Sequence, residues 1–350
     1  MFSVSQIIAL ATALSSASAA CVPRGSSGSG SETTPTSAAP TTTSSLVASN
    51  LPVQAVSTSA SSAAPTSSAA AASSSSSASS DGTKYFAVFG DSYSSTGFYI
   101  EGGFPSASNP LGSGGSTTTG GLNWVGMVTE QLNSSLVLTY DFAYYGADIS
   151  NAIINTGVTT DLIAQVGEFE DNLVPAPTEA PWTAENLLVA VWIGINDIGQ
   201  CFWQSSQYTT CPIDEALTKY FDLLQNLYTD GARNFVLNTV PPFYKAPAFK
   251  DQSETSVEGL ISNLDSFNSK LATKLADFKS SNTGVTAQVF NTTSYFWEVF
   301  NDPTSFGLDS DITAANADGT SAVWYDNYHP GQAIHTLVAK GFVAALADFF

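Results

Sequence analysis

An apolar run that ends abruptly in small and polar residues constrains the fold of this chain more than any other segment. Residues 84–97 read KYFAVFGDSYSSTG, and the apolar part, residues 85–89, stops at Gly90-Asp91-Ser92. This pattern is typical of a buried parallel strand that leads into a tight turn. Because ligands bind where loops leave the carboxyl ends of parallel strands, Ser92 is a candidate nucleophile if a base lies nearby.

Two histidines, His329 and His335, are the available bases. His329 lies in the turn-prone segment WYDNYHPG, three residues after Asp326. Within a single turn, this spacing lets the carboxylate accept the Nδ1 proton of the imidazole and leaves Nε2 free to accept the serine proton. We therefore predict a catalytic triad of Ser92, His329 and Asp326. His335 falls in a helical pattern and is expected to be structural or solvent-facing.

The composition divides the 350 residues into a polar tail and one domain. Residues 1–20 hold a short apolar stretch followed by small residues, which predicts a secretory signal peptide cleaved after Ala19 or Ala20. Residues 21–82 are dominated by Ser, Thr, Ala and Pro and cannot bury enough apolar surface to offset the entropy of ordering. We expect a disordered, O-glycosylated linker there. Residues 83–350 are long enough for a single domain built around one sheet.

The net charge limits the partners of the protein. Acidic residues outnumber basic ones by 30 to 10, and residues 83–350 keep 28 acidic against 9 basic residues, a formal charge of −19. Such a field repels phosphate backbones and anionic lipids, so we expect no nucleic-acid or membrane partner. It suits the solubility of a secreted, extracellular protein, which we expect to be a monomer. No apolar run is long enough for stable membrane insertion.

Strand and helix patterns alternate along the domain. Apolar runs predict further strands at residues 136–143, 187–193, 235–240 and 285–290. Helical spacing predicts helices at residues 124–132, 213–230, 260–278 and after residue 330. The alternation implies an α/β fold, a three-layer α/β/α sandwich with a central parallel sheet. Residues 102–121, rich in Gly, Ser and Thr, are expected to form a loop that shapes a cleft over the sheet.

Candidate ligand-binding and supporting residues follow three of the predicted strands. Gly146 can turn its backbone N–H toward a ligand, although a glycine there can equally serve the turn alone. Asn196 carries an uncharged amide that can donate to a substrate oxygen, as an oxyanion hole requires. Asp197 is expected to tie its loop together by accepting backbone N–H bonds, and we assign Asp91 the same supporting role.

Four sequence blocks resemble those of the GDSL, or SGNH, hydrolases, and they occur in the same order. They are GDSY at residues 90–93, Gly146 within DFAYYGADISN, GIND at residues 194–197 and DNYH at residues 326–329. The flanking segments NWV, VWIGINDIG, NTVPPF and YDNYHP resemble fungal acetylesterases of carbohydrate esterase family 16. The resemblance runs from about residue 84 to residue 350. At Asp141 the chain departs from the family, which usually has asparagine there.

The resemblance implies a flavodoxin-like sandwich, and the absence of a G-x-S-x-G motif around Ser92 argues against the α/β-hydrolase elbow. It assigns the oxyanion hole to the backbone N–H groups of Ser92 and Gly146 and to the amide of Asn196. It implies a serine esterase that removes acetyl groups from plant cell-wall xylo-oligosaccharides or hydrolyses other small esters, without a cofactor. Two alternatives are a GDSL lipase or phospholipase acting on longer acyl esters, and a non-catalytic cell-wall or carbohydrate-binding protein.

Cysteines and glycosylation sequons complete the predictions. Cys201 and Cys211 are ten residues apart, and an exported protein favours a local disulfide between them. Their spacing does not match a C-x-x-C metal pair, so we expect no metal site. Asn133 and Asn291 begin N-glycosylation sequons. Cys21 either joins two chains or is a free or removed residue.

Overall fold

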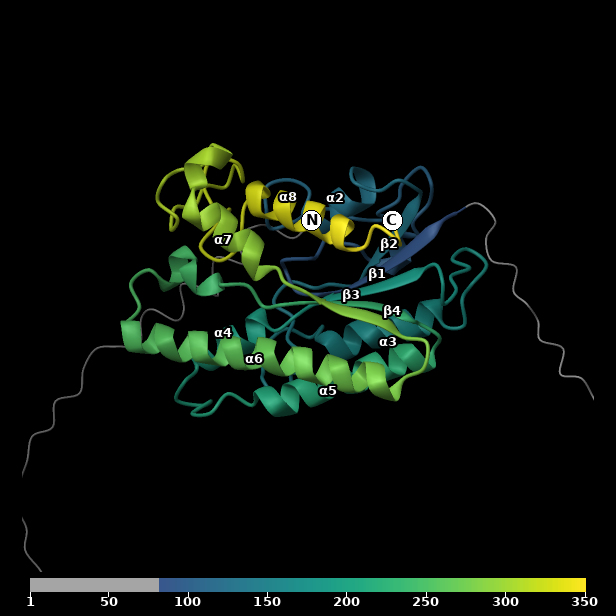
Figure 1. The fold of residues 1–350 in the computed structure, drawn as a ribbon, viewed down its shortest axis with the longest axis horizontal. Helices are drawn as coiled ribbons and strands as arrows, with labels where there is room; N and C mark the ends of the chain where they lie inside the picture. The colour runs from purple at the N-terminus through teal and green to yellow at the C-terminus, as the bar shows by residue number, and fades with distance from the viewer. Residues whose placement is uncertain (1–81) are drawn as a thin grey trace, which may run out of the picture. The chain divides into compact units, whose positions relative to one another are not determined.

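A five-stranded parallel sheet forms the centre of the domain (Figure 1). The computed structural model describes residues 82–350. The predicted signal peptide, Cys21 and all but the last residue of the predicted linker lie outside this range. The strands are β1 (Lys84–Gly90), β2 (Val137–Asp141), β3 (Leu187–Trp192), β4 (Asn234–Asn238) and β5 (Thr286–Phe290), in the spatial order β2-β1-β3-β4-β5.

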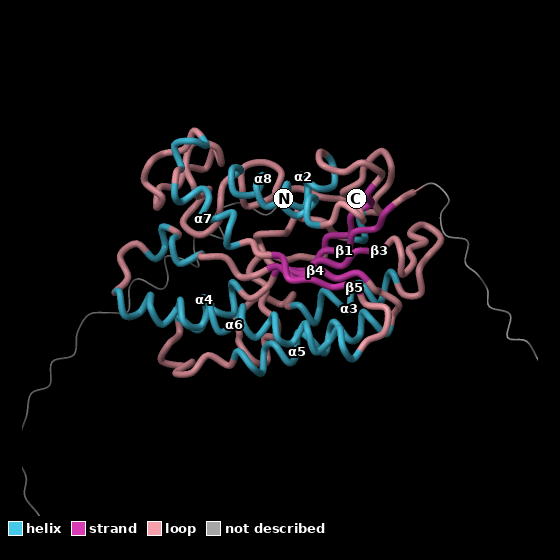
Figure 2. The backbone as a smooth tube through the Cα atoms, viewed as in Figure 1, coloured by secondary structure: helices cyan, strands magenta, loops and turns pink. Residues whose placement is uncertain are grey.

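Helices cover both faces of the sheet, which confirms the predicted three-layer α/β/α sandwich. One layer contains α2 (Trp124–Glu130), α7 (Thr293–Asn301) and α8 (Gln332–Ala345). The other contains α3 (Leu162–Leu173), α4 (Ile195–Trp203), α5 (Ile213–Thr229) and α6 (Glu254–Ser281). Figure 2 shows the strands between these two layers. Four short 3-10 helices lie in the connections: η1 (Ile100–Gly102), η2 (Phe243–Lys245), η3 (Pro247–Phe249) and η4 (Pro303–Phe306).

The apolar strands form a core on both faces of the sheet. Every residue of β3 is buried, as expected for the central strand of a parallel sheet. On β1, successive side chains point to opposite faces. Phe86 therefore packs against Trp124 and Phe342 of one helical layer, with ring centroids 6.0 and 5.8 Å away. Phe89 packs against Phe169 of the other layer, with a centroid distance of 5.9 Å.

Some helices differ from the predictions for reasons that the apolar spacing does not reveal. Helix α6 begins six residues earlier than predicted, because Ser253 caps it by accepting the N–H of Ser256 and its first turns are polar. The predictions omitted α3, α4 and α7. The loop predicted at Asn196 and Asp197 is wrong, because both residues lie in the first turn of α4. Gly194 has a φ of +112°, which lets β3 turn directly into that helix.

The carboxyl end of β1 is held by a side chain from another layer. Gln165 on α3 accepts the N–H of Gly90 and donates to its carbonyl oxygen, both at 2.8 Å. Strand β2 ends at Asp141, opposite Val88, so it does not reach Gly90. The two bonds to Gln165 therefore take the place of bonds to a neighbouring strand. A side chain at Gly90 would collide with the carbonyl oxygen of Trp192. Gln165 and the glycine together fix the point from which Ser92 projects.

The second histidine is structural. His335 is buried on α8, and its Nδ1 accepts the backbone N–H of Trp124 at 3.3 Å. Burial lowers the pKa of His335 to about 3, so the ring stays neutral. The prediction of a structural residue is confirmed, and the alternative of a solvent-facing residue is wrong.

Cys201 and Cys211 form the predicted disulfide, with Cα atoms 5.5 Å apart. It ties the end of α4 to the segment before α5.

Of the two sequon asparagines, Asn291 is exposed, whereas Asn133 is half-buried and its Nδ2 donates to the carbonyl oxygens of Val128 and Thr129. Glycosylation stays a prediction at both. Among residues 82–350, no helix is both long and apolar enough to cross a membrane.

Replacing Gln165 by leucine should destabilise the domain. The change leaves the buried N–H of Gly90 without an acceptor, whereas the carbonyl of Gly90 still accepts from Tyr144. We expect the free energy of unfolding to fall by about 1–3 kcal/mol. Urea denaturation measures this loss. Gln200→Leu, which removes one exposed bond to Asn155, is the matched control. Equal stability of the two variants would show that Gln165 does not hold the strand end.

Candidate active site

The structure brings the three predicted triad residues together. Ser92 lies in the turn directly after β1, and its Oγ is 2.8 Å from Nε2 of His329. Nδ1 of His329 is 2.8 Å from Oδ2 of Asp326 and 3.0 Å from Oδ1. Asp326 and His329 share the segment that leads into α8. A hydroxyl, an imidazole and a carboxylate therefore form one hydrogen-bonded series, the arrangement that activates a serine.

The Asp326 carboxylate is held by its own turn. Its Oδ1 accepts the backbone N–H groups of Tyr328 and His329, both at 2.8 Å. Burial by itself raises the pKa of Asp326, but the hydrogen bond and charge of His329, with the two backbone bonds, hold that pKa below its ordinary value. The group therefore stays ionised. An ionised carboxylate keeps the proton of His329 on Nδ1 and leaves Nε2 to accept from Ser92.

Tyr93 connects the two halves of the site and was missed in the sequence. Its ring is fully buried, and its hydroxyl donates to the carbonyl oxygen of Tyr328 at 2.7 Å. The ring centroid lies 5.8 Å from that of His329. The residue after Ser92 thus contacts the segment that carries His329. An aromatic residue directly after GDS was the available signal.

The three predicted oxyanion donors, Ser92, Gly146 and Asn196, follow β1, β2 and β3. Within residues 82–350, the backbone N–H groups of Ser92 and Gly146 donate to no other residue. Gly146 has a φ of +77°, and the N–H of nearby Tyr144 donates to the carbonyl of Gly90 at 3.0 Å, which ties this loop to the end of β1. Asn196 donates one amide hydrogen to the carbonyl of Ala147 at 2.9 Å and keeps a second.

Buried aspartates support these loops. Asp91 accepts the N–H of Tyr93 at 2.9 Å, and burial raises the pKa of Asp91 to about 7. Asp197 accepts the N–H of Ile149 at 3.1 Å, so it ties its helix to the neighbouring loop. Burial, followed by the charge of Asp148, raises the pKa of Asp197 to about 8.

Two further buried aspartates, Asp141 and Asp148, also accept backbone N–H groups and have raised pKa values. Asp141, where the chain departs from the family pattern, accepts the N–H of Thr96 at 2.6 Å and that of Ala143 at 3.2 Å, one with each oxygen. An asparagine in the same orientation would turn its NH₂ group toward one of these two N–H donors. Asp148, which the sequence analysis did not single out, accepts the N–H of Thr156. Burial raises the pKa of Asp141 to about 7 and that of Asp148 to about 6.

The loop at residues 102–121 reaches the nucleophile turn, as expected. The hydroxyl of Thr118 donates to the carbonyl of Ser92 at 2.7 Å. Gln332, the first residue of α8, donates to the carbonyl oxygens of Thr119 and Leu122, each at 3.0 Å. The loop is thereby fixed both to Ser92 and to the helix that follows His329.

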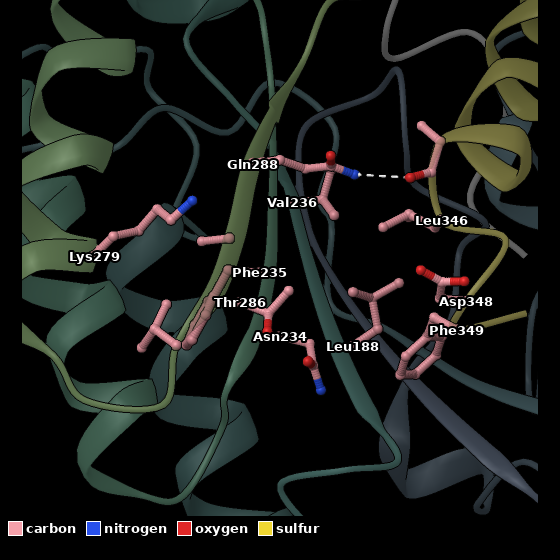
Figure 3. A pocket seen from close by; sticks show the side chains of 13 residues that line it. Leu188, Asn234, Phe235, Val236, Lys279, Thr286, Gln288, Leu346, Asp348 and Phe349 are labelled. Atoms are coloured by element: carbon pink, nitrogen blue, oxygen red, sulfur yellow. Dashed lines mark hydrogen bonds between the residues drawn. The ribbon is translucent and has the colours of Figure 1, made fainter.

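A cavity of about 450 Å³ lies far from these groups (Figure 3). It is lined by Leu188, Asn234 and Thr286, within the first two residues of β3, β4 and β5, and by residues after α8. In a parallel sheet this edge is opposite the one that carries Ser92. Gln288 donates to the carbonyl of Ala345 there at 3.3 Å, which closes one side. Within the described residues, no cluster of three or more His, Cys, Asp or Glu side chains is arranged for a metal ion.

Comparison with known proteins gives the family. The model of the GDSL-like lipase/acylhydrolase family matches residues 86–342. An acetylesterase from Thermothelomyces thermophilus is 41% identical over 274 residues, which cover 77% of this chain and 90% of that protein. An acetylesterase from Hypocrea jecorina is 23% identical over 322 residues, covering 75% and 88%. A solved alpha/beta hydrolase from the metagenome of Lake Arreo, Spain, has a TM-score of 0.47 at 13% identity, covering 76% of this chain and 96% of its own. The chain thus belongs to the GDSL-like lipase/acylhydrolase family and is a carboxylic ester hydrolase.

Proposed function

We propose that the protein removes acetyl groups from carbohydrate esters such as plant cell-wall xylo-oligosaccharides, with Ser92 as the nucleophile. The observation that carries this proposal is the distance of 2.8 Å between Ser92 Oγ and His329 Nε2, on an imidazole that Asp326 orients. The 41% identity to a protein named acetylesterase supports the acetyl group as the acyl part. The resemblance of the NWV, VWIGINDIG, NTVPPF and YDNYHP segments supports a place in carbohydrate esterase family 16.

The reaction has two steps. His329 Nε2 takes the Ser92 proton as Oγ attacks the ester carbonyl, and the N–H groups of Ser92 and Gly146 with the amide of Asn196 stabilise the oxyanion. Protonated His329 then gives its proton to the leaving alcohol, and the acetyl group remains on Oγ. In the second step His329 deprotonates water, which attacks the acetyl-serine carbonyl. The bond to Ser92 Oγ breaks, His329 returns the proton to Oγ, and acetate is released. Asp326 stabilises the imidazolium in both steps.

We propose an extracellular setting for this reaction. The pattern of residues 1–20 supports export, and the disulfide between Cys201 and Cys211 suits an oxidising compartment. Residues 21–82 are proposed to be an O-glycosylated linker that leads to the catalytic domain at residues 83–350. The charge of −20 supports a neutral substrate over an anionic one.

The buried aspartates also support a mildly acidic working environment. The pKa values of Asp91, Asp141, Asp148 and Asp197 all lie above their ordinary value of 3.8 in the folded protein. Between about pH 4 and pH 8, the folded state therefore binds more protons than the unfolded state, and stability falls as the pH rises. Asp326 has the opposite effect, because its pKa is lowered in the folded protein. It stabilises the folded state at higher pH, and this stabilisation is lost only as the pH falls below about 4.

Ser92→Ala should abolish turnover while it leaves the fold intact. The change removes the nucleophilic oxygen, and we expect kcat on p-nitrophenyl acetate to fall by about 10⁶-fold with an unchanged melting temperature. Stopped assays and thermal unfolding measure the two effects. Ser280→Ala, at an exposed position on α6, should retain full activity. Turnover by Ser92→Ala at the wild-type rate would remove Ser92 from the mechanism.

Asn196→Ala should lower kcat by about 10²- to 10³-fold, because one oxyanion donor is lost. The effect should be mainly in kcat, since the oxyanion forms only in the transition state. Steady-state kinetics on p-nitrophenyl acetate separate kcat from KM. A variant with normal kcat and a raised KM would show that Asn196 binds the ground state and not the oxyanion.

The acyl preference separates an acetylesterase from a lipase, the other activity in the family name. We expect kcat/KM for p-nitrophenyl acetate to exceed that for the octanoate ester by at least about tenfold, because differences of a few methylene groups are worth that much in a fitted pocket. Rates below the solubility limit of each ester avoid micelle effects. A preference for octanoyl or longer esters would favour the lipase activity.

The unfolding free energy should fall by several kcal/mol from pH 5 to pH 8, as the buried aspartates ionise. Urea denaturation at each pH measures the slope. Asp197→Asn keeps an oxygen for the N–H of Ile149 and removes one titrating group, so the slope should become shallower. Asp265→Asn, an exposed residue on α6, should leave the slope unchanged. A wild-type stability that rises toward pH 8 contradicts this account.

A further inference from the structure

We propose that a pocket between the disulfide-bonded loop and the start of α6 binds the sugar chain of the substrate, beyond the residue that carries the acetyl group. This inference rests on the proposed carbohydrate esterase function and assigns the part of the molecule that selects the alcohol. The pocket has a volume of about 610 Å³. One wall is formed by residues 201–211 and the other by residues 252–263.

The lining of the pocket suits a neutral, hydroxyl-rich ligand. Its walls carry hydroxyl and amide groups from Ser205, Tyr208, Thr209, Gln252, Ser262 and Asn263. None of the residues that line it is charged, in a protein with 30 acidic and 10 basic residues. Hydroxyl and amide groups can donate and accept hydrogen bonds in the way that sugar hydroxyls require. A fatty chain would leave these groups without partners, and a phosphate or carboxylate would find no cation.

An exposed tryptophan stands at the rim of the pocket. Trp203, the last residue of α4, has 44% of its surface exposed. One face of its indole is stacked on Phe249, with a centroid distance of 5.0 Å and an interplanar angle of 26°, and Phe202 meets it edge-on at 4.7 Å. The packing fixes the orientation of the ring. A fixed aromatic face next to hydroxyl groups can pack against the apolar face of a sugar ring.

Packed side chains connect the wall of the pocket to the segment that carries His329. Helix α4 carries the proposed oxyanion donor Asn196 in its first turn and ends at Trp203, about 10 Å farther along its axis at 1.5 Å per residue. The ring of Phe249 lies 5.8 Å from that of Tyr328, which lies 6.0 Å from the ring of His329. The N–H of Ala248 donates to the carbonyl of Asn327 at 2.9 Å. A sugar chain with its acetyl group at Ser92 can therefore extend toward Trp203.

The wall of the pocket is preorganised. The disulfide between Cys201 and Cys211 closes the loop that carries Tyr208 and Thr209. The hydroxyl of Tyr208 accepts the N–H of Asn155 at 3.1 Å, which anchors the same loop to the segment after Gly146. A site whose walls are held before binding loses less entropy when the ligand is ordered.

Two variants test the pocket with acetylated xylo-oligosaccharides of increasing length and with p-nitrophenyl acetate. Trp203→Ala should lower kcat/KM for the oligosaccharides at least about tenfold more than for p-nitrophenyl acetate, mainly by raising KM. The difference should grow with chain length, and Trp203→Phe should restore part of the loss. Trp297→Ala, at another exposed tryptophan outside the pocket, should lower neither activity.

Gly259→Leu adds a side chain at the wall of the pocket, and its Cβ meets no other atom within 4 Å. It should reproduce the selective loss on oligosaccharides while the melting temperature stays normal. Equal losses on both substrates, or no loss in either variant, would overturn the proposed pocket. If the wild-type enzyme cleaves p-nitrophenyl acetate and no acetylated sugar, the carbohydrate function itself is wrong, and that result needs no variant.

Discussion

The hydrogen bond from Ser92 to His329 joins two segments that are 237 residues apart, and the rest of the site depends on that contact. A flexible chain would lose much conformational entropy in holding two such distant side chains at hydrogen-bonding distance. The packing of the whole domain supplies the free energy that offsets this loss. The parallel sheet places the end of β1 at one edge, and α8 packs against α2 beside it. Tyr93 then adds a direct bond across the two segments through the carbonyl of Tyr328.

Beyond the carboxyl ends of the strands, side chains form the hydrogen bonds to backbone groups that neighbouring strands form within the sheet. Gln165 pairs with Gly90, Asp141 accepts two backbone N–H groups, and Asp197 accepts that of Ile149. Each bond satisfies a buried backbone group that would otherwise destabilise the loop. The acids among them are costly to ionise where they lie, which links the stability of the loops to pH. The loops around Ser92 are thus held by groups outside the proposed triad.

Local pattern was sufficient to predict the strands and the triad. Each of these patterns lies within a short stretch of chain. The strand ends at Gly-Asp-Ser, and the aspartate lies three residues before the histidine. The conformation of such a short stretch depends mainly on its own residues. The same holds for the disulfide, whose cysteines are ten residues apart. The proposed oxyanion role of Gly146 came from the resemblance to a family, because a glycine after a strand has several uses, whereas that of Asn196 came from its uncharged amide at the end of a strand.

The sequence by itself therefore determined the class of fold, the candidate nucleophile and the base, since these follow from hydrophobic periodicity and short-range spacing. Only the tertiary structure decided the roles of Tyr93, Gln165 and Asp148, and the start of α4 at Ile195. It also decided that Trp203 and Asn263, from different helices, line one uncharged pocket. These features depend on which side chains meet across layers. Such meetings are set by packing between distant segments, which no local pattern records.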